Sequence, residues 1–388
     1  MINHTVVKMD PVDSGGEANS AIFGVGFSCR TFFTILVFAI WLFLPGCITF
    51  GPKRIAVDSF NYNEVIARSS NEQMLLNLVR LRYREVPVFL AVGSVISQYF
   101  YAGNFGTSAA FGKDLGHTVQ RFGADAGMLY SERPTITYSP LSGSEFSQQL
   151  LTPIPNDLVF SLAQSGWSPD QLLMMCLERL NHVENMRFGS VASQDELKEA
   201  GAFQRVVQLL VELSRRRAIE MQSSNAKTPN TRSLVFEQEP DRDTGNLIKE
   251  LKLMLGLDPQ YSSFRVTERM IRRKPDEITI RVRSILALMG FLSRGVDIPT
   301  AHLEEKRVDG MPFTIDEDFR SQLFPLKIHS QPDQPDDAFV AVRYNDYWFY
   351  ISRSDQKSKE SFGLLTYLFL MQAHQAQTLG PMITVPTS

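Results

Sequence analysis

Few residues of this 388-residue chain stand in arrangements that could do chemistry. No pair among the three cysteines and six histidines has the spacing of a helical metal motif, and there is no CxxC motif. The sequence also has no glycine-rich phosphate loop and no GxSxG nucleophile motif. We therefore predict no catalytic residue, no metal ligand and no cofactor, and we expect that the protein is not an enzyme.

Cys47 is the cysteine whose surroundings indicate a specific reaction. It ends the stretch 31–47, TFFTILVFAIWLFLPGC, in which an almost purely apolar run follows Arg30. The apolar part is shorter than the roughly 20 residues that a membrane-spanning helix needs. A positive charge before the run and small residues at its end are typical of a signal peptide. We predict that residues 1–46 are a signal peptide.

The four residues from Leu44 to Cys47 resemble the lipobox of bacterial lipoproteins. This resemblance implies cleavage after Gly46, lipidation of the Cys47 thiol and acylation of the new amino terminus, for example with palmitate. Several acyl chains on one residue anchor a protein more firmly than one chain does. Ile48 follows the cysteine where an aspartate would imply the inner membrane, so the resemblance implies the periplasmic face of the outer membrane. The alternative is an uncleaved anchor in which Cys47 is an ordinary thiol.

The composition is that of an ordinary globular protein, with 44% hydrophobic and 21% charged residues. A net charge of −3 implies no broad basic surface, so we expect no nucleic-acid partner. Cys29 lies in the predicted leader, which leaves Cys176 as the only free thiol of the mature chain. Its apolar neighbours predict a buried, inert thiol.

Residues 97–131 predict a long β-hairpin. Before the turn at 112–117, the odd positions are mostly aromatic or apolar: Tyr99, Tyr101, Phe105, Ala109 and Phe111. After the turn, the even positions continue this pattern: Phe122, Ala124, Ala126, Met128 and Tyr130. A period of two on both sides of a turn is typical of a hairpin, and each arm exceeds the usual strand length of about 5–6 residues.

Two interpretations of this hairpin stay open. A membrane-crossing strand needs about 9–11 residues, with one apolar face and aromatic residues near its ends. In that interpretation several copies each insert one hairpin, because a single hairpin would leave unpaired backbone groups in lipid. The membrane-facing residues would be Tyr99, Tyr101, Phe105, Phe111, Phe122, Met128 and Tyr130. In the other interpretation the hairpin is soluble.

The rest of the chain predicts an α+β fold with helices beside the hairpin in the first half and a small mixed sheet with packed helices in the second. We expect one domain over 47–222, a polar linker over 223–246 and a second domain over 247–388. The linker is interrupted only by a strand expected over 233–236. We also expect a helix that begins at the capping box 70–73 and has Met74, Leu75, Leu78 and Leu81 as its apolar stripe, and a long helix capped at 193–196. Shorter expectations are a helix through LLMMCLERL to about His182, a separate strand over 133–139 and a two-residue turn at Asn345–Asp346.

Three blocks of sequence, Gln73–Tyr99, Arg133–Trp167 and Tyr347–Leu365, together resemble a family of uncharacterised lipoproteins of Gram-negative bacteria. The resemblance covers most of the mature chain. It implies no activity, cofactor or catalytic residue, and it agrees with a lipoprotein signal and with a long hairpin between the first two blocks.

From these features we expect a lipoprotein of the cell envelope with a structural or transport-accessory role. Its partners would be the membrane, through the lipid anchor, and further copies of itself or other envelope proteins. One alternative is a monomeric periplasmic binding or scaffold module with a soluble hairpin. Another is an enzyme of a class that the sequence does not reveal.

Overall fold

The computed structural model describes residues 52–114, 117–187, 193–223, 232–269, 271–310 and 316–373. Cys47 and the predicted leader lie outside the described residues, so the signal peptide and the lipidation stay predictions. Residues from Asn63 onward form one compact unit. Helices and several sheets alternate in it, which confirms the predicted α+β class.

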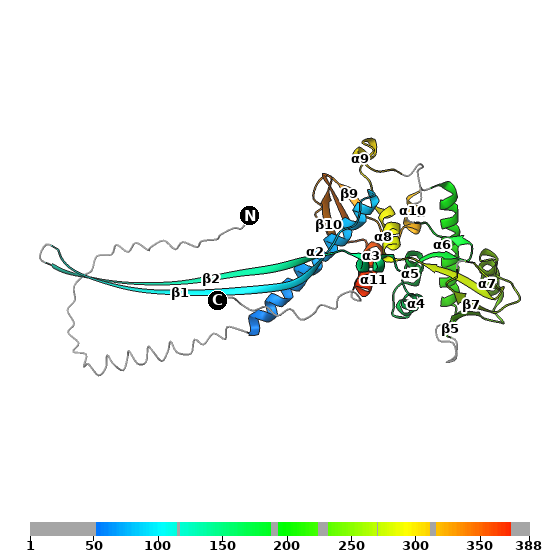
Figure 1. The fold of residues 1–388 in the computed structure, drawn as a ribbon, viewed down its shortest axis with the longest axis horizontal. Helices are drawn as coiled ribbons and strands as arrows, with labels where there is room; N and C mark the ends of the chain where they lie inside the picture. The colour runs from blue at the N-terminus through cyan, green and yellow to red at the C-terminus, as the bar shows by residue number, and fades with distance from the viewer. Residues whose placement is uncertain are drawn as a thin grey trace. The chain divides into compact units, whose positions relative to one another are not determined.

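Figure 1 shows the helices and strands along the chain. The helices are α2 (Pro52–Arg82), α3 (Ser144–Leu151), α4 (Asn156–Gln164), α5 (Pro169–Cys176), α6 (Gln194–Arg215), α7 (Arg242–Met254), α8 (Ile285–Leu292), the 3-10 helix η1 (Ser293–Gly295), α9 (Thr300–Glu304), α10 (Glu317–Leu323) and α11 (Gln356–Ala373). The strands are β1 (Phe89–Asp114), β2 (His117–Leu141), β3 (Leu177–Leu180), β4 (Val183–Glu184), β5 (Ile219–Ser223), β6 (Arg232–Phe236), β7 (Ser263–Thr267), β8 (Glu277–Val282), β9 (His329–Gln331), β10 (Ala338–Tyr344) and β11 (Tyr347–Ser352).

A six-stranded sheet in the order β4-β3-β8-β7-β6-β5 joins the two halves of the chain. Its neighbouring strands are antiparallel except for β7 and β8, which are parallel. The predicted linker 223–246 is therefore wrong as a domain boundary, because it contains β6 and because strands on both sides of it share this sheet. Leu234 and Phe236 of β6 are buried. The strand predicted over 233–236 within that stretch is confirmed as β6.

A smaller sheet in the order β10-β11-β9 lies further along the chain. The two-residue turn predicted at Asn345–Asp346 is confirmed. Both residues have positive φ angles, 45° and 68°. This left-handed geometry matches the natural twist of antiparallel strands, and asparagine and aspartate tolerate it better than most residues.

The helix predicted to begin at the capping box 70–73 begins much earlier, at Pro52. Ser70 and Gln73 thus lie inside α2, where polar residues cost only tenths of a kcal/mol to about 0.7 kcal/mol each. The apolar stripe predicted for this helix is buried as expected, namely Met74, Leu75, Leu78 and Leu81.

The segment LLMMCLERL is divided between a helix and a strand. Helix α5 ends at Cys176, and Leu177–Leu180 forms β3, which pairs with β8. The predicted helix to His182 was therefore too long, because pairing with a distant strand overrides local helix propensity. Cys176 is fully buried, and this burial raises the pKa of its thiol to about 12.

Candidate functional site: the β1–β2 hairpin and its attachment

The hairpin is longer than the sequence predicted. Strand β1 has 26 residues and β2 has 25, and they pair antiparallel from Phe89–Leu141 to Asp114–His117, side by side in Figure 1. At about 3.3 Å per residue, 26 residues extend about 85 Å. The stretch 133–139 is therefore a continuation of β2 and not a separate strand. Pro134 is tolerated there because β2 has a neighbour on one side only.

The register places the predicted apolar residues on one face of the hairpin. Tyr101 lies opposite Tyr130, and Phe105 lies opposite Ala126. Directly opposed residues of an antiparallel pair share a face. Odd positions of β1 beyond residue 94 therefore share a face with even positions of β2. This face holds all seven residues proposed to face a membrane: Tyr99, Tyr101, Phe105, Phe111, Phe122, Met128 and Tyr130.

Most register positions of the opposite face hold polar or small residues, although Phe100 and Leu129 also lie on it. The opposed pairs there include Gln98–Arg133, Asn104–Gly127, Gly106–Asp125, Ser108–Gly123 and Ala110–Arg121. Gly106 and Ser108 are exposed. The hairpin is thus two-faced along its outer part, as its alternating sequence predicted.

A β-bulge between Val92 and Ser94 shifts the register near the start of β1. The extra residue, Gly93, reverses the alternation of β1 relative to β2. As a result Val92 lies opposite Tyr138 and Val95 opposite Ile136, which continues the apolar face toward the body. The sequence gives little sign of this bulge apart from the glycine itself.

The two hairpin strands form a sheet of their own. Neither pairs with a third strand among the described residues. Each outer edge is a row of backbone N–H and C=O groups available to another strand. A two-stranded hairpin is also only marginally stable in water, whereas three or more strands with an apolar face are stable. The hairpin is therefore suited to pair with strands of another chain along its outer edges.

Two side chains of α2 hold the start of the hairpin. Asn77 is fully buried; its Nδ2 donates to the carbonyl of Val88 at 2.7 Å, and its Oδ1 accepts from the N–H of Val88 at 2.9 Å. One turn earlier on α2, Gln73 accepts a hydrogen bond from the N–H of Leu90 at 3.0 Å. Gln73, predicted as part of a helix cap, is thus a residue of this attachment.

Apolar contacts complete the attachment. Phe89 is buried, with its ring stacked on Phe369 of α11 at 4.6 Å between centroids and edge-on to Phe146 of α3 at 5.7 Å. Leu141, its partner at the end of β2, packs against the same core. Both ends of the hairpin are therefore joined to helices of the body.

We predict that Asn77→Ala loosens this attachment. The substitution leaves both polar groups of Val88 without their side-chain partner, which costs about 1–3 kcal/mol for a buried group and less for one that water can reach. Amide hydrogen exchange should accelerate at residues 88–91, while exchange in the six-stranded sheet stays unchanged. Arg68→Ala, at an exposed position earlier on α2, is the control. Equal exchange in Asn77→Ala and the native protein would contradict this role.

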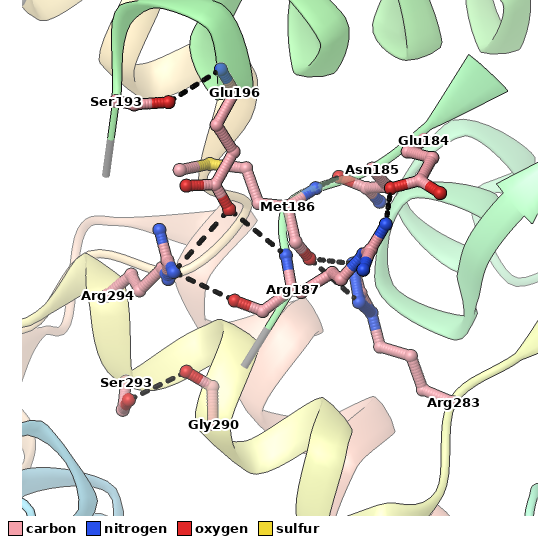
Figure 2. A network of polar contacts seen from close by, with 10 residues as sticks. All are labelled: Glu184, Asn185, Met186, Arg187, Ser193, Glu196, Arg283, Gly290, Ser293 and Arg294. Carbon is pink, nitrogen blue, oxygen red and sulfur yellow. Dashed lines mark hydrogen bonds and ion pairs between the residues drawn. The ribbon is translucent and has the colours of Figure 1, made fainter. Parts of the chain in front are cut away.

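A second polar cluster lies in the core of the body around Arg283 (Figure 2). This arginine is 1% exposed, and its guanidinium donates to the carbonyl of Met175 at 3.0 Å and twice to the carbonyl of Met186, at 2.8 and 3.1 Å. It also lies 4.2 Å from the centroid of the Phe291 ring. Burial lowers the pKa of Arg283 to about 10, so it stays charged at neutral pH.

Buried Asn185 extends this cluster. Its Nδ2 donates to the carbonyls of Met174 and Leu177 at 2.9 and 3.0 Å, and its Oδ1 accepts from the N–H of Met186 at 2.8 Å. Together, Asn185 and Arg283 donate hydrogen bonds to backbone carbonyls at the end of α5, at the start of β3 and just after β4. Since Arg283 is closed to solvent, we interpret the cluster as structural.

The outer side of the cluster connects to α6. Arg294 donates to the carbonyl of Arg187 at 2.8 Å and forms an ion pair with Glu196 at 3.6 Å (Figure 2). Ser193 Oγ accepts from the N–H of Glu196 at 3.1 Å. Ser193 therefore caps α6 in the way that its capping-box sequence predicts.

We predict that Arg283→Met lowers the free energy of unfolding by about 3 kcal/mol, because two buried carbonyls lose their donors. Urea unfolding followed by circular dichroism measures this change. Arg205→Met is the matched control; it removes a half-exposed ion pair with Glu250, which contributes less than about 1 kcal/mol. Equal effects of the two substitutions would contradict the structural role of Arg283.

A third polar group joins the end of α2 to α9 and to the turn after β10. The buried Tyr83 hydroxyl donates to Nδ1 of His302 at 2.6 Å, and Nε2 of His302 donates to the carbonyl of Asn345 at 3.1 Å. A carbonyl can only accept, so Nε2 carries the proton in this arrangement. Burial raises the pKa of Tyr83 to about 12. Both side chains are enclosed, which favours a structural role.

The described residues hold no group of three or more histidine, cysteine, aspartate or glutamate side chains arranged to bind a metal ion. In the same part of the chain, no helix is both long and apolar enough to cross a membrane. Comparison of the chain with protein-family models, curated proteins and solved structures found no match in any of the three. The resemblance to a lipoprotein family therefore stays a prediction.

Proposed function

We propose that this chain is a lipid-anchored subunit on the periplasmic face of the outer membrane, where several copies assemble through their β1–β2 hairpins and insert the outer part of each hairpin into the membrane. One observation carries the proposal: the register puts all seven residues proposed to face a membrane on one face of a hairpin whose two edges pair with no further strand among the described residues. Strands from neighbouring copies would satisfy those edges in lipid.

The spacing of the aromatic residues supports a membrane-crossing segment. Tyr101 and Tyr130 mark one end of it, and Phe111 and Phe122 lie near the other. The paired spans 101–111 and 120–130 each contain 11 residues. A strand that crosses a membrane needs about 9–11 residues and carries aromatic girdles at both interfaces.

The inner part of the hairpin would then lie between the membrane and the body. From Leu90 to Tyr101 the strand extends about 36 Å. Its start is fixed to the body, because the N–H of Leu90 donates a hydrogen bond to Gln73 of α2.

The alternative function is a monomeric periplasmic binding or scaffold module with a soluble hairpin. The hairpin is more than twice as long as a membrane-crossing strand, which this alternative also accommodates. The two differ in oligomeric state and in their response to a charge on the apolar face. Those two properties are the ones to measure.

For the assembly we predict different results from two arginine substitutions three residues apart. Phe105→Arg places a charge on the apolar face near the middle of the proposed span, where it costs about 2–4 kcal/mol in lipid. Ser108→Arg places the same charge on the polar face. Light scattering in mild detergent should find oligomers of the native protein and of Ser108→Arg, and monomers of Phe105→Arg. A native protein that is monomeric in every detergent would contradict the assembly.

For the lipid anchor we predict that cells fed an alkyne-tagged palmitate label the native protein and Cys176→Ser, but not Cys47→Ser. Only a thiol at the predicted cleavage site directs the lipidation, since Cys176 is buried. Label retained in Cys47→Ser would contradict the anchor and leave the hairpin hypothesis to be judged by its own test.

A further inference from the structure

The body contains an apolar cleft that neither the hairpin nor the polar clusters use. It has a volume of about 460 Å³ and lies between helices α4, α5 and α6 and one side of the six-stranded sheet. Ligand sites in proteins typically measure about 300–1,000 Å³ and have mostly apolar walls with a few polar groups. The cleft therefore has the size and the lining of a small-molecule site.

Most side chains that line the cleft are apolar, and many of them are only partly buried by the rest of the fold. Its floor includes Leu234 and Ile280 of the sheet, which are buried. Its sides include half-buried residues of several elements: Phe160, Ala163, Leu173, Leu210, Met221 and Val266. Removing such surfaces from water is favourable by about 25 cal/mol per Å². A hydrocarbon chain is the kind of ligand that gains most from them.

A single cation, Arg232, stands among the lining residues. Its Nε donates to Oδ1 of Asp157 at 2.9 Å, its Nη2 lies 2.8 Å from the same oxygen in an ion pair, and its guanidinium lies 4.8 Å from the centroid of the Phe160 ring. These contacts, both from α4, hold the guanidinium in one orientation. Within the described part of the chain, Nη1 makes no hydrogen bond and is available as a donor.

The charges around Arg232 indicate which charged group an apolar ligand in this cleft would carry. Its side chain is 24% exposed, and charge-assisted hydrogen bonds are stronger in such partly desolvated places. Asp157 and the lining residue Glu220 carry negative charges that oppose a doubly charged phosphate more than a singly charged carboxylate. An apolar chain ending in one carboxylate fits both parts of the cleft.

We propose that this cleft binds a long-chain fatty acid, with the hydrocarbon between α4, α5, α6 and the sheet and the carboxylate on Nη1 of Arg232. The proposal is independent of the hairpin assembly, since no residue of β1 or β2 lines the cleft. It assigns the body of the protein a ligand-binding role beside the membrane role proposed for the hairpin.

The test uses the purified full-length protein and the fluorescent fatty acid cis-parinaric acid, displaced by oleate or by oleyl alcohol. The native protein should bind oleate saturably at one site. Arg232→Gln should weaken oleate binding at least about tenfold, the size of effect expected from losing one charge-assisted hydrogen bond of about 1.5 kcal/mol. Its affinity for oleyl alcohol should stay the same. Arg205→Gln, which removes a comparable arginine–glutamate pair outside the cleft, is the control and should bind oleate normally.

A second variant tests the position of the hydrocarbon chain. Ala163→Trp fills the cleft and should abolish binding of both oleate and the alcohol, whereas Leu253→Trp at an exposed site of α7 should not. Circular dichroism verifies the fold of each variant. Absence of saturable oleate binding, or equal oleate affinity in Arg232→Gln and Arg205→Gln, would overturn the proposal. If Ala163→Trp fails to fold, the comparison of the two arginine variants decides alone.

Discussion

The whole structure depends on one requirement: the backbone N–H and C=O groups of every segment need hydrogen-bond partners. Asn77 shows this most directly, because its side-chain amide bonds both the N–H and the carbonyl of Val88. Where α2 gives way to β1, no regular element is available to pair with this residue, and one amide side chain takes that place. Arg283 and Asn185 do the same for the carbonyls around α5 and β4 in the core. In each place a single polar side chain determines how one segment meets the next.

The β1–β2 hairpin also has many backbone N–H and C=O groups that need hydrogen-bond partners. Its strands satisfy each other along one edge only, and in the part of the chain that the structure describes no strand pairs with its outer edges, which are each some 25 residues long. Water can solvate such edges, but the marginal stability of an isolated two-stranded sheet favours a structure in which other strands join it. The apolar face adds a second reason, because it gains from removal from water. The proposed assembly of several copies in a membrane would meet both demands at once.

The body combines a well-packed core with one apolar cleft. Helix α8 is almost entirely buried and occupies the core, whereas α4, α5 and α6 leave space against the sheet. The ion pair of Arg232 with Asp157 fixes a charge near that space without closing it. A protein with a membrane-directed hairpin and a cleft suited to an acyl chain would have two sites of related chemistry on separate parts of its fold.

The sequence by itself determined the features that rest on local periodicity. The alternation around Phe105 and Met128 predicted the hairpin and its two faces, the stripe from Met74 to Leu81 predicted the buried side of α2, and Asn345–Asp346 predicted its turn. These patterns depend on geometry repeated every two or 3.6 residues, so a short window of sequence contains them.

Tertiary structure alone decided the features that depend on pairing between distant segments. Strand β3 follows a helix without a break and is a strand because β8 offers it hydrogen bonds. Strand β6 pairs with strands on both sides of the predicted linker, so the stretch joins the two halves of the chain and does not separate them. The bulge at Gly93, the attachment by Asn77 and the cleft beside Arg232 likewise join residues far apart in the chain or out of phase with its pattern. No local periodicity records such contacts, because their energy comes from partners that only the folded chain brings together.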